Sequence, residues 1–167
     1  MENGRKEEPR TFFQRRTIPR NKQRNRNFVY ETKEFNLNKD ENFAIQVNFT
    51  FQWDTDGEAS IIYGEDKSSN GFYYVKLSNK ENSRIHIGKI IDGEQGQEIQ
   101  VQGDVKSIRK QNRIAIIKYG NELKFNVNDN FVYTKNFEPF FGKGIGIGCE
   151  NIQNISFNLF FVNQQKS

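Results

Sequence analysis

Apolar residues that recur at every second position, between short turns, constrain the fold of this chain more than any other feature. The pattern is clearest in residues 112–148, where it covers residues 114–116 and then 123–127. Turn-forming residues follow each run, at Tyr119-Gly120-Asn121 and at Asn128-Asp129-Asn130. A period of two between Gly, Asn and Asp turns is typical of antiparallel strands with one buried face. This segment therefore predicts a meander of short strands.

The same pattern extends over most of the chain. In residues 43–52, FAIQVNFTFQ, five apolar side chains share one face and polar or small ones share the other. The 16 Phe and 6 Tyr provide large side chains for a core, although only 34% of the residues are hydrophobic. Turns every 8–12 residues predict a sandwich of two antiparallel sheets. The further strands are expected at residues 28–36, 59–64, 72–78, 84–91, 98–102 and 154–162, with a turn over 92–97 and a single helical turn near 105–110.

The net charge of +4 is unevenly distributed. Residues 1–27 contain nine basic and three acidic side chains, whereas the rest of the chain has a net charge of −2. Such asymmetry predicts a basic arm attached to a nearly neutral domain. The arm has too few apolar residues to fold alone. We therefore expect an irregular arm over residues 1–27, a β-sandwich over 28–163 and a polar tail over 164–167.

Residues 40–162 contain a series of core and turn motifs. They are Tyr63-Gly64, Asn70-Gly71-Phe72, Ile108-Arg109-Lys110 with Asn112, Asn128, and Phe141-Gly142 with Ile145-Gly146. In this order the motifs resemble the concanavalin A-like sandwiches of the laminin-G/glucanase type. The resemblance implies a jelly roll of two curved sheets, and it concerns core and turn features, so it bears on fold more than on function.

Laminarinase-like enzymes of that fold place Glu-x-Asp-x-Glu on a strand, so that alternate carboxylates face one cleft. The nearest match here is Asp54-Thr55-Asp56-Gly57-Glu58, in which the first residue is Asp and Asp-Gly favours a turn. We therefore expect no catalytic residues and no enzyme activity. Asp54, Asp56 and Glu58 are also a weak candidate for a calcium site, but they supply too few ligands, and turn formation explains them more simply. No cofactor is predicted.

An aromatic strand next to a polar loop indicates a candidate glycan site. Because residues 72–74 are consecutive, Tyr73 must face the side of the sheet opposite to Phe72 and Tyr74. Asn70 lies in the adjoining loop, and Trp53 is a second available platform. Aromatic rings beside amide groups are typical of sugar-binding sites, although most aromatic residues in such a sandwich belong to the core.

The remaining reactive residues point to no chemistry. His86 stands between two isoleucines and is expected on an outward face, while the single cysteine, Cys149, is expected to be buried and inert. The glycines of residues 142–148 fit a strand better than a phosphate loop, because no helix follows them. No apolar run is long enough to span a membrane, and the first residues lack a signal peptide, which predicts an intracellular protein in the cytoplasm or cytoskeleton.

Three functional hypotheses follow. The first is a non-enzymatic structural or adaptor subunit of a larger complex, whose basic arm binds an acidic protein or ribonucleoprotein surface. The second is a lectin-like module that binds glycans, and the third is an atypical glycoside hydrolase. The charge asymmetry favours the first. Its arm contacts are expected from Phe12, Phe13, Arg15, Arg16, Arg20, Arg24 and Arg26.

Overall fold

The computed structural model describes residues 16–17, 28–51, 58–78, 85–101, 111–150 and 155–165. These ranges contain strands, turns and bends but no helix, and hence no helix of a length and hydrophobicity suited to crossing a membrane. The strands are β1 (Arg16–Thr17), β2 (Phe28–Glu34), β3 (Asn42–Phe51), β4 (Glu58–Asp66), β5 (Gly71–Ser78), β6 (Ile85–Ile91), β7 (Glu94–Val101), β8 (Gln111–Tyr119), β9 (Glu122–Val127), β10 (Asn130–Asn136), β11 (Gly144–Glu150) and β12 (Ile155–Gln165).

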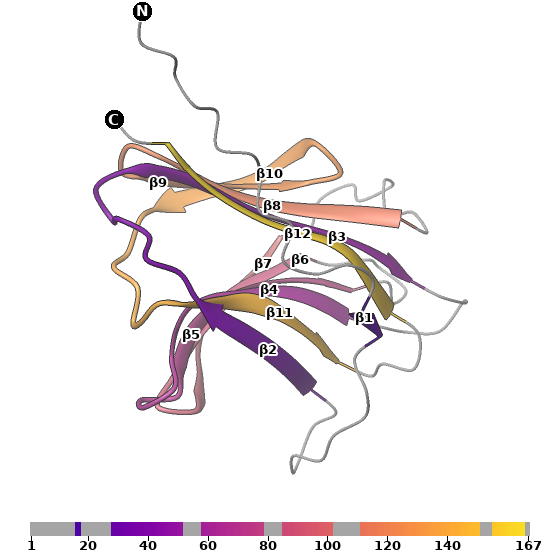
Figure 1. The fold of residues 1–167 in the computed structure, drawn as a ribbon, viewed down its shortest axis with the longest axis horizontal. Coiled ribbons are helices and arrows are strands. Elements are labelled where there is room, and N and C mark those ends of the chain that lie inside the picture. Colours follow the sequence, from indigo (N-terminus) through magenta and orange to yellow (C-terminus); the bar gives the residue numbers. More distant parts are fainter. Residues whose placement is uncertain are drawn as a thin grey trace, which may run out of the picture.

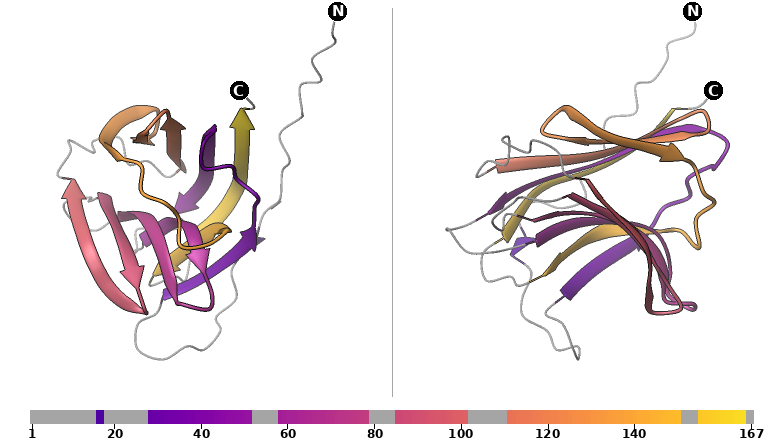
Figure 2. Two further views of the ribbon diagram at one scale, coloured as in Figure 1. Left: turned by 90° about the vertical axis from the view of Figure 1, so that its left-hand side faces the viewer. Right: turned by 180° about the vertical axis from the view of Figure 1, so that it is seen from behind.

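Within the described ranges these strands form two antiparallel six-stranded sheets, which lie face to face (Figure 1). Sheet A has the order β1-β12-β3-β8-β9-β10, and sheet B has the order β2-β11-β4-β5-β6-β7. Each sheet contains a meander of consecutive strands, β8-β9-β10 in sheet A and β4-β5-β6-β7 in sheet B. The last two strands, β11 and β12, are consecutive in the chain but lie in different sheets. The two further views in Figure 2 show the layers from the side. The predicted two-sheet jelly roll is confirmed.

The core lies between the sheets and follows the predicted alternation. In β3 every second side chain is buried, and the same period occurs in β8 and β9. The inward residues of both sheets form one cluster that includes Phe49, Phe125 and Phe157. Phe140, from the segment between β10 and β11, packs on Phe43 and Tyr63 at one end of the sandwich. Burial of these rings supplies most of the driving force for folding.

The glycine-rich segment is a strand, as expected. In β11, Ile145, Ile147 and Cys149 enter the core, so the glycines between them lie on the outer face of sheet B. A Cβ atom at Gly146 would collide with the backbone carbonyl of Glu31 in the neighbouring strand. Glycine at this position therefore permits the close pairing of β2 with β11.

One predicted turn is wrong. Residues 92–97 were expected to form a turn, with a strand starting at residue 98, but β7 starts at Glu94. The turn is only Asp92-Gly93, and both residues have positive φ values, 50° and 80°. This backbone matches the tight hairpins that Asp-Gly favours. The first half of β7 is exposed and polar because β7 is an edge strand, so its sequence resembles a loop.

Several expectations fall on residues outside the described ranges. They are the helical turn near residues 105–110, the platform Trp53, the candidate calcium ligands Asp54 and Asp56, and the whole arm except for Arg16–Thr17. The two-residue strand β1 pairs with Phe157 and Ser156 of β12.

Candidate functional site

The outer face of sheet B, which points away from the core, carries the candidate site. Phe72 and Tyr74 lie on this face with Ile62, whereas Tyr73 packs in the core, so the predicted opposition is confirmed. Phe72 and Tyr74 are only 8% and 6% exposed. Side chains from neighbouring strands therefore cover these rings although they lie on an outer face. Phe72 packs on Tyr30, whereas the neighbours of Tyr74 are polar side chains.

Tyr74 is the centre of a hydrogen-bond network that spans β5, β6 and β7. Its hydroxyl donates to the Glu98 carboxylate and accepts a bond of 2.7 Å from the Gln95 side-chain amide. The other carboxylate oxygen of Glu98 lies 2.9 Å from Nδ1 of His86. The register places Gly88 opposite both Tyr74 and Glu98, and a Cβ there would collide with the tyrosine ring and hydroxyl. Glycine at position 88 thus makes room for the network.

The network sets the protonation of its members. Burial disfavours ionisation of Glu98, but hydrogen bonds from Tyr74 and His86 outweigh that effect, so the pKa of this carboxyl lies below its ordinary value. Burial, together with the bond to Glu98, raises the pKa of Tyr74. At neutral pH the site therefore presents an ionised carboxylate held by a neutral phenol.

An ion pair borders the network on the side of β4. Lys76 lies opposite His86 in the sheet, and its ammonium is 3.3 Å from the Glu58 carboxylate. The same ammonium lies 5.9 Å from the centre of the Tyr74 ring, in a cation–π contact. Glu58 thus contacts a lysine. In the described part of the chain, no group of three or more His, Cys, Asp or Glu residues is placed to hold a metal ion.

A second patch of the same face joins β2 to β4. The Tyr30 ring packs on Phe72 with 5.4 Å between ring centres, and it is 39% exposed. Glu65 accepts hydrogen bonds from Thr32 and Tyr30. Burial and the neighbouring Glu65 raise the pKa of Tyr30 to about 12. Among the described aromatic residues of this face, Tyr30 offers the most open ring surface.

Sequence reasoning identified only part of this face. It named Phe72 and Tyr74, which the structure brings together, and Asn70, which lies in the turn just before β5. Asn70 has a φ of 49°, and its carbonyl accepts a hydrogen bond from Gly93, which joins two hairpin turns. Tyr30 was missed because pairing between strands that are distant in the sequence brings it to the face. Gln95 and Glu98 were missed because a turn was expected over residues 92–97, where the structure has the β6–β7 hairpin.

The structure also shows the directions of the His86 and Cys149 side chains, which were predicted from the sequence. His86 lies on the outer face of sheet B with its side chain 13% exposed, and Cys149 lies in the core. These two residues therefore form no catalytic pair. Burial raises the pKa of the Cys149 thiol to about 12, which agrees with the expected inert cysteine.

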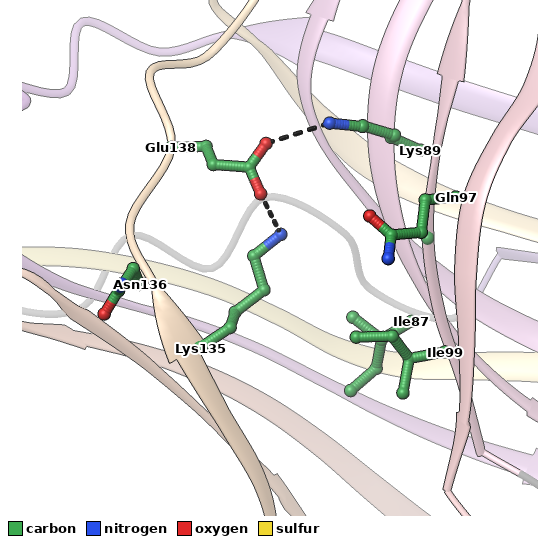
Figure 3. A pocket seen from close by; sticks show the side chains of 8 residues that line it. Ile87, Lys89, Gln97, Ile99, Lys135, Asn136 and Glu138 are labelled. Carbon is green, nitrogen blue, oxygen red and sulfur yellow. Dashed lines mark hydrogen bonds and ion pairs between the residues drawn. The ribbon is translucent and has the colours of Figure 1, made fainter.

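A small pocket of about 140 Å³, lined by charged, amide and aliphatic side chains, lies on the inner side of the same strands, between β6 and β7 of sheet B and β10 of sheet A (Figure 3). Glu138 sits between two lysines, with Nζ of Lys89 at 3.0 Å and Nζ of Lys135 at 2.9 Å. The hydrogen bond from Lys135 lowers the pKa of the Glu138 carboxyl against the effect of burial, and Lys89 adds to it. The pocket and the outer-face network use opposite faces of β6 and β7.

Comparisons with known proteins find similar structures but no family of similar sequence. No protein-family model matches the chain, and no curated protein matches it. Among solved structures, the carbohydrate-binding module CBM66 from Bacillus subtilis is 14% identical, with a TM-score of 0.57 over 75% of this chain and 76% of that one. A human galectin-16 variant is 15% identical, with a TM-score of 0.60 over 81% and 95%. A tetrameric galectin from the ball sponge Cinachyrella sp. is 10% identical, with a TM-score of 0.60 over 83% and 100%. The chain thus shares the concanavalin A-like jelly roll of galectins and carbohydrate-binding modules.

Proposed function

We propose that this protein is a non-enzymatic carbohydrate-binding module and that the glycan binds on the outer face of sheet B. One observation carries the proposal, namely the network of Tyr74, Gln95, Glu98 and His86 around a cluster of aromatic rings on a single sheet face. Sugars are bound by this combination, in which rings contact C–H groups and fixed polar groups bond the hydroxyls. The fold shared with galectins and a carbohydrate-binding module supports it.

The geometry suits recognition of a neutral sugar. The Glu98 carboxylate and the Gln95 side-chain carbonyl are acceptors of fixed orientation. Both residues come from an edge strand that is open on one side. Tyr30, at the other side of the face, offers an exposed ring for stacking. Groups whose orientation is already fixed lose little entropy when the ligand binds.

The adaptor hypothesis depends on the arm, which lies outside the described residues except for Arg16–Thr17. It therefore stays a prediction, as does the binding of an acidic partner. The candidate carboxylates of a glycoside hydrolase, Asp54 and Asp56, also lie outside the described residues, and Glu58 is paired with Lys76. Neither hypothesis gains a supporting contact from the described residues.

A glycan array probed with the full chain tests the proposal. We expect wild-type protein to bind a subset of neutral glycans and Glu98→Gln to weaken that binding about ten- to a hundredfold, because a hydrogen bond to a charged group contributes about 1.5–3 kcal/mol. Glu94→Gln is the matched control, since Glu94 is exposed in the same strand. An array without any bound glycan, or equal binding by wild type and Glu98→Gln, would refute the proposal.

A further inference from the structure

The pocket between the sheets is separate from the outer-face network because of the strand alternation. In β6 and β7, His86 and Glu98 face outward, whereas Ile87 and Ile99 line the pocket from the inner side. The pocket lies at the side of the sandwich where β7 and β10 are the last strands of their sheets. A ligand there would contact both sheets at once without touching the outer face.

The charge of the pocket lining is positive. Lys89 and Lys135 supply two positive charges, and Glu138 supplies one negative charge that both lysines contact. Each ammonium has three hydrogens and uses one of them for Glu138. The remaining donors can bind a second anionic group in the space that Figure 3 shows beside the ion pairs.

The two lysines are held rather than free. Their side chains are 25% and 18% exposed, and the Lys135 ammonium lies 5.3 Å from the centre of the Tyr73 ring. Glu138 fixes both ammonium groups, and Tyr73 lies 3.4 Å from the same carboxylate. Fixed cations of low exposure attract an anion more strongly than freely moving surface lysines do.

Neutral donors and an apolar floor complete the lining. The side-chain amides of Gln97 and Asn136 line the pocket, and neither forms a hydrogen bond within the described residues. Ile87 and Ile99 form the opposite wall, as Figure 3 shows. A site with two ammonium groups, two amides and two aliphatic side chains suits a ligand that is charged at one end and apolar at the other.

We propose that this pocket binds a small carboxylate of about the size of one sugar ring, with the carboxylate on Lys89 and Lys135. The volume of about 140 Å³ is of the order of one such molecule. A uronic acid and a free organic acid share this chemistry. The proposal does not depend on the outer-face glycan site, because the side chains that would bind the carboxylate differ from those of the Tyr74 network. Gly88, which lines the pocket and leaves room for the network, adjoins both.

The effect of replacing Glu138 on anion binding distinguishes a binding site from a purely structural ion pair. In a site for an anion, Glu138 repels the ligand while it positions the lysines, so Glu138→Gln raises the net charge and strengthens anion binding several-fold. Lys89→Gln and Lys135→Gln each weaken it about tenfold, because each removes a charged hydrogen-bond donor. The control Lys124→Gln, at an exposed position in β9, leaves it unchanged.

The experiment is a ¹⁵N NMR titration of the full chain with glucuronate, acetate, glucose and inorganic phosphate. We expect glucuronate to shift the side-chain amide signals of Gln97 and Asn136, and glucose to leave them in place. Acetate that shifts the same signals supports a free organic acid as the source, and glucuronate acting alone supports a sugar acid.

Three results overturn the proposal. They are an absence of shifts with both carboxylates, equal shifts with glucose and glucuronate, and stronger shifts with phosphate than with either carboxylate. A Glu138→Gln variant that is folded but binds glucuronate more weakly would also refute it. The signals of Gln95 and His86 report on the outer face in the same spectra, so failure at one site is distinguishable from failure at the other.

Discussion

Cys149 shows how far burial controls a single residue. Its thiol lies in the core, and its pKa is raised from 9.0 to about 12 by burial. The thiolate fraction at neutral pH thus falls roughly a thousandfold. We expect an aromatic disulfide reagent to react with native protein at least that much more slowly than with protein in urea. Equally fast labelling in both states would contradict the buried position.

Residues of the candidate site differ in how far sequence could predict them. The opposite directions of Tyr73 and Tyr74 follow from strand geometry alone, and the structure bears them out. The contact between Tyr30 and Phe72 could not be predicted, because it crosses β11, which comes more than seventy residues after Phe72. Glu98 was missed for a local reason, since a turn was expected over residues 92–97 and the register of β7 with β6 was therefore not predicted.

At the scale of an element, the hairpin between β9 and β10 is the most tightly specified. Asn128 and Asp129 both have positive φ values, 50° and 66°, which match the tight turn that their sequence predicts. Asn128 also joins the turn to β8. Its side chain accepts from the Arg113 backbone at 2.8 Å and donates to the Asn112 amide at 3.1 Å.

Replacement of Asn128 tests that role. We expect Asn128→Ala to lower the free energy of unfolding by about 2–4 kcal/mol, because alanine disfavours positive φ and leaves the buried Asn112 without this partner. Asp129→Gly is the matched change, since glycine tolerates the same backbone and only an exposed ion pair with Arg113 is lost. Urea unfolding of both variants measures the difference. Equal losses would show that the Asn128 side chain adds nothing.

The edge strand β7 shows where element prediction fails. Its first residues are exposed and polar, so the period-two signal that identified β3 and β8 is missing. Only its pairing with β6 makes it a strand. Edge strands with one neighbour and two polar faces give little local signal, and here the edge strand also supplies the central carboxylate of the site.

For the whole molecule, sequence predicted two antiparallel sheets and the meander that contains β8 and β9, but not how the other strands pair. The alternation in each strand identifies its buried face, but it does not predict that β11 and β12 lie in different sheets. The pocket of Lys89, Lys135 and Glu138 lies between β10 and the strands β6 and β7, at the side where β7 and β10 are the last strands of their sheets. Both candidate sites thus depend on how the strands pair, and both include β7, whose first half shows no local strand pattern.

The Glu138 ion pairs link the segment after β10 to β6 in the other sheet, so they make the association of the sheets dependent on pH. The pKa of Glu138 is lowered in the folded protein, chiefly by the hydrogen bond from Lys135. Its contribution to stability is therefore full above the unfolded pKa of 4.5 and is lost as the pH falls through the lower folded pKa. We expect Glu138→Gln to melt at a lower temperature than wild type at about pH 7, and the two melting temperatures to converge towards about pH 2–3.

Thermal melts followed by circular dichroism measure this difference in melting temperature, with Glu94→Gln as the exposed control. A gap that stays constant with pH would show that the ionised carboxylate does not hold the sheets together.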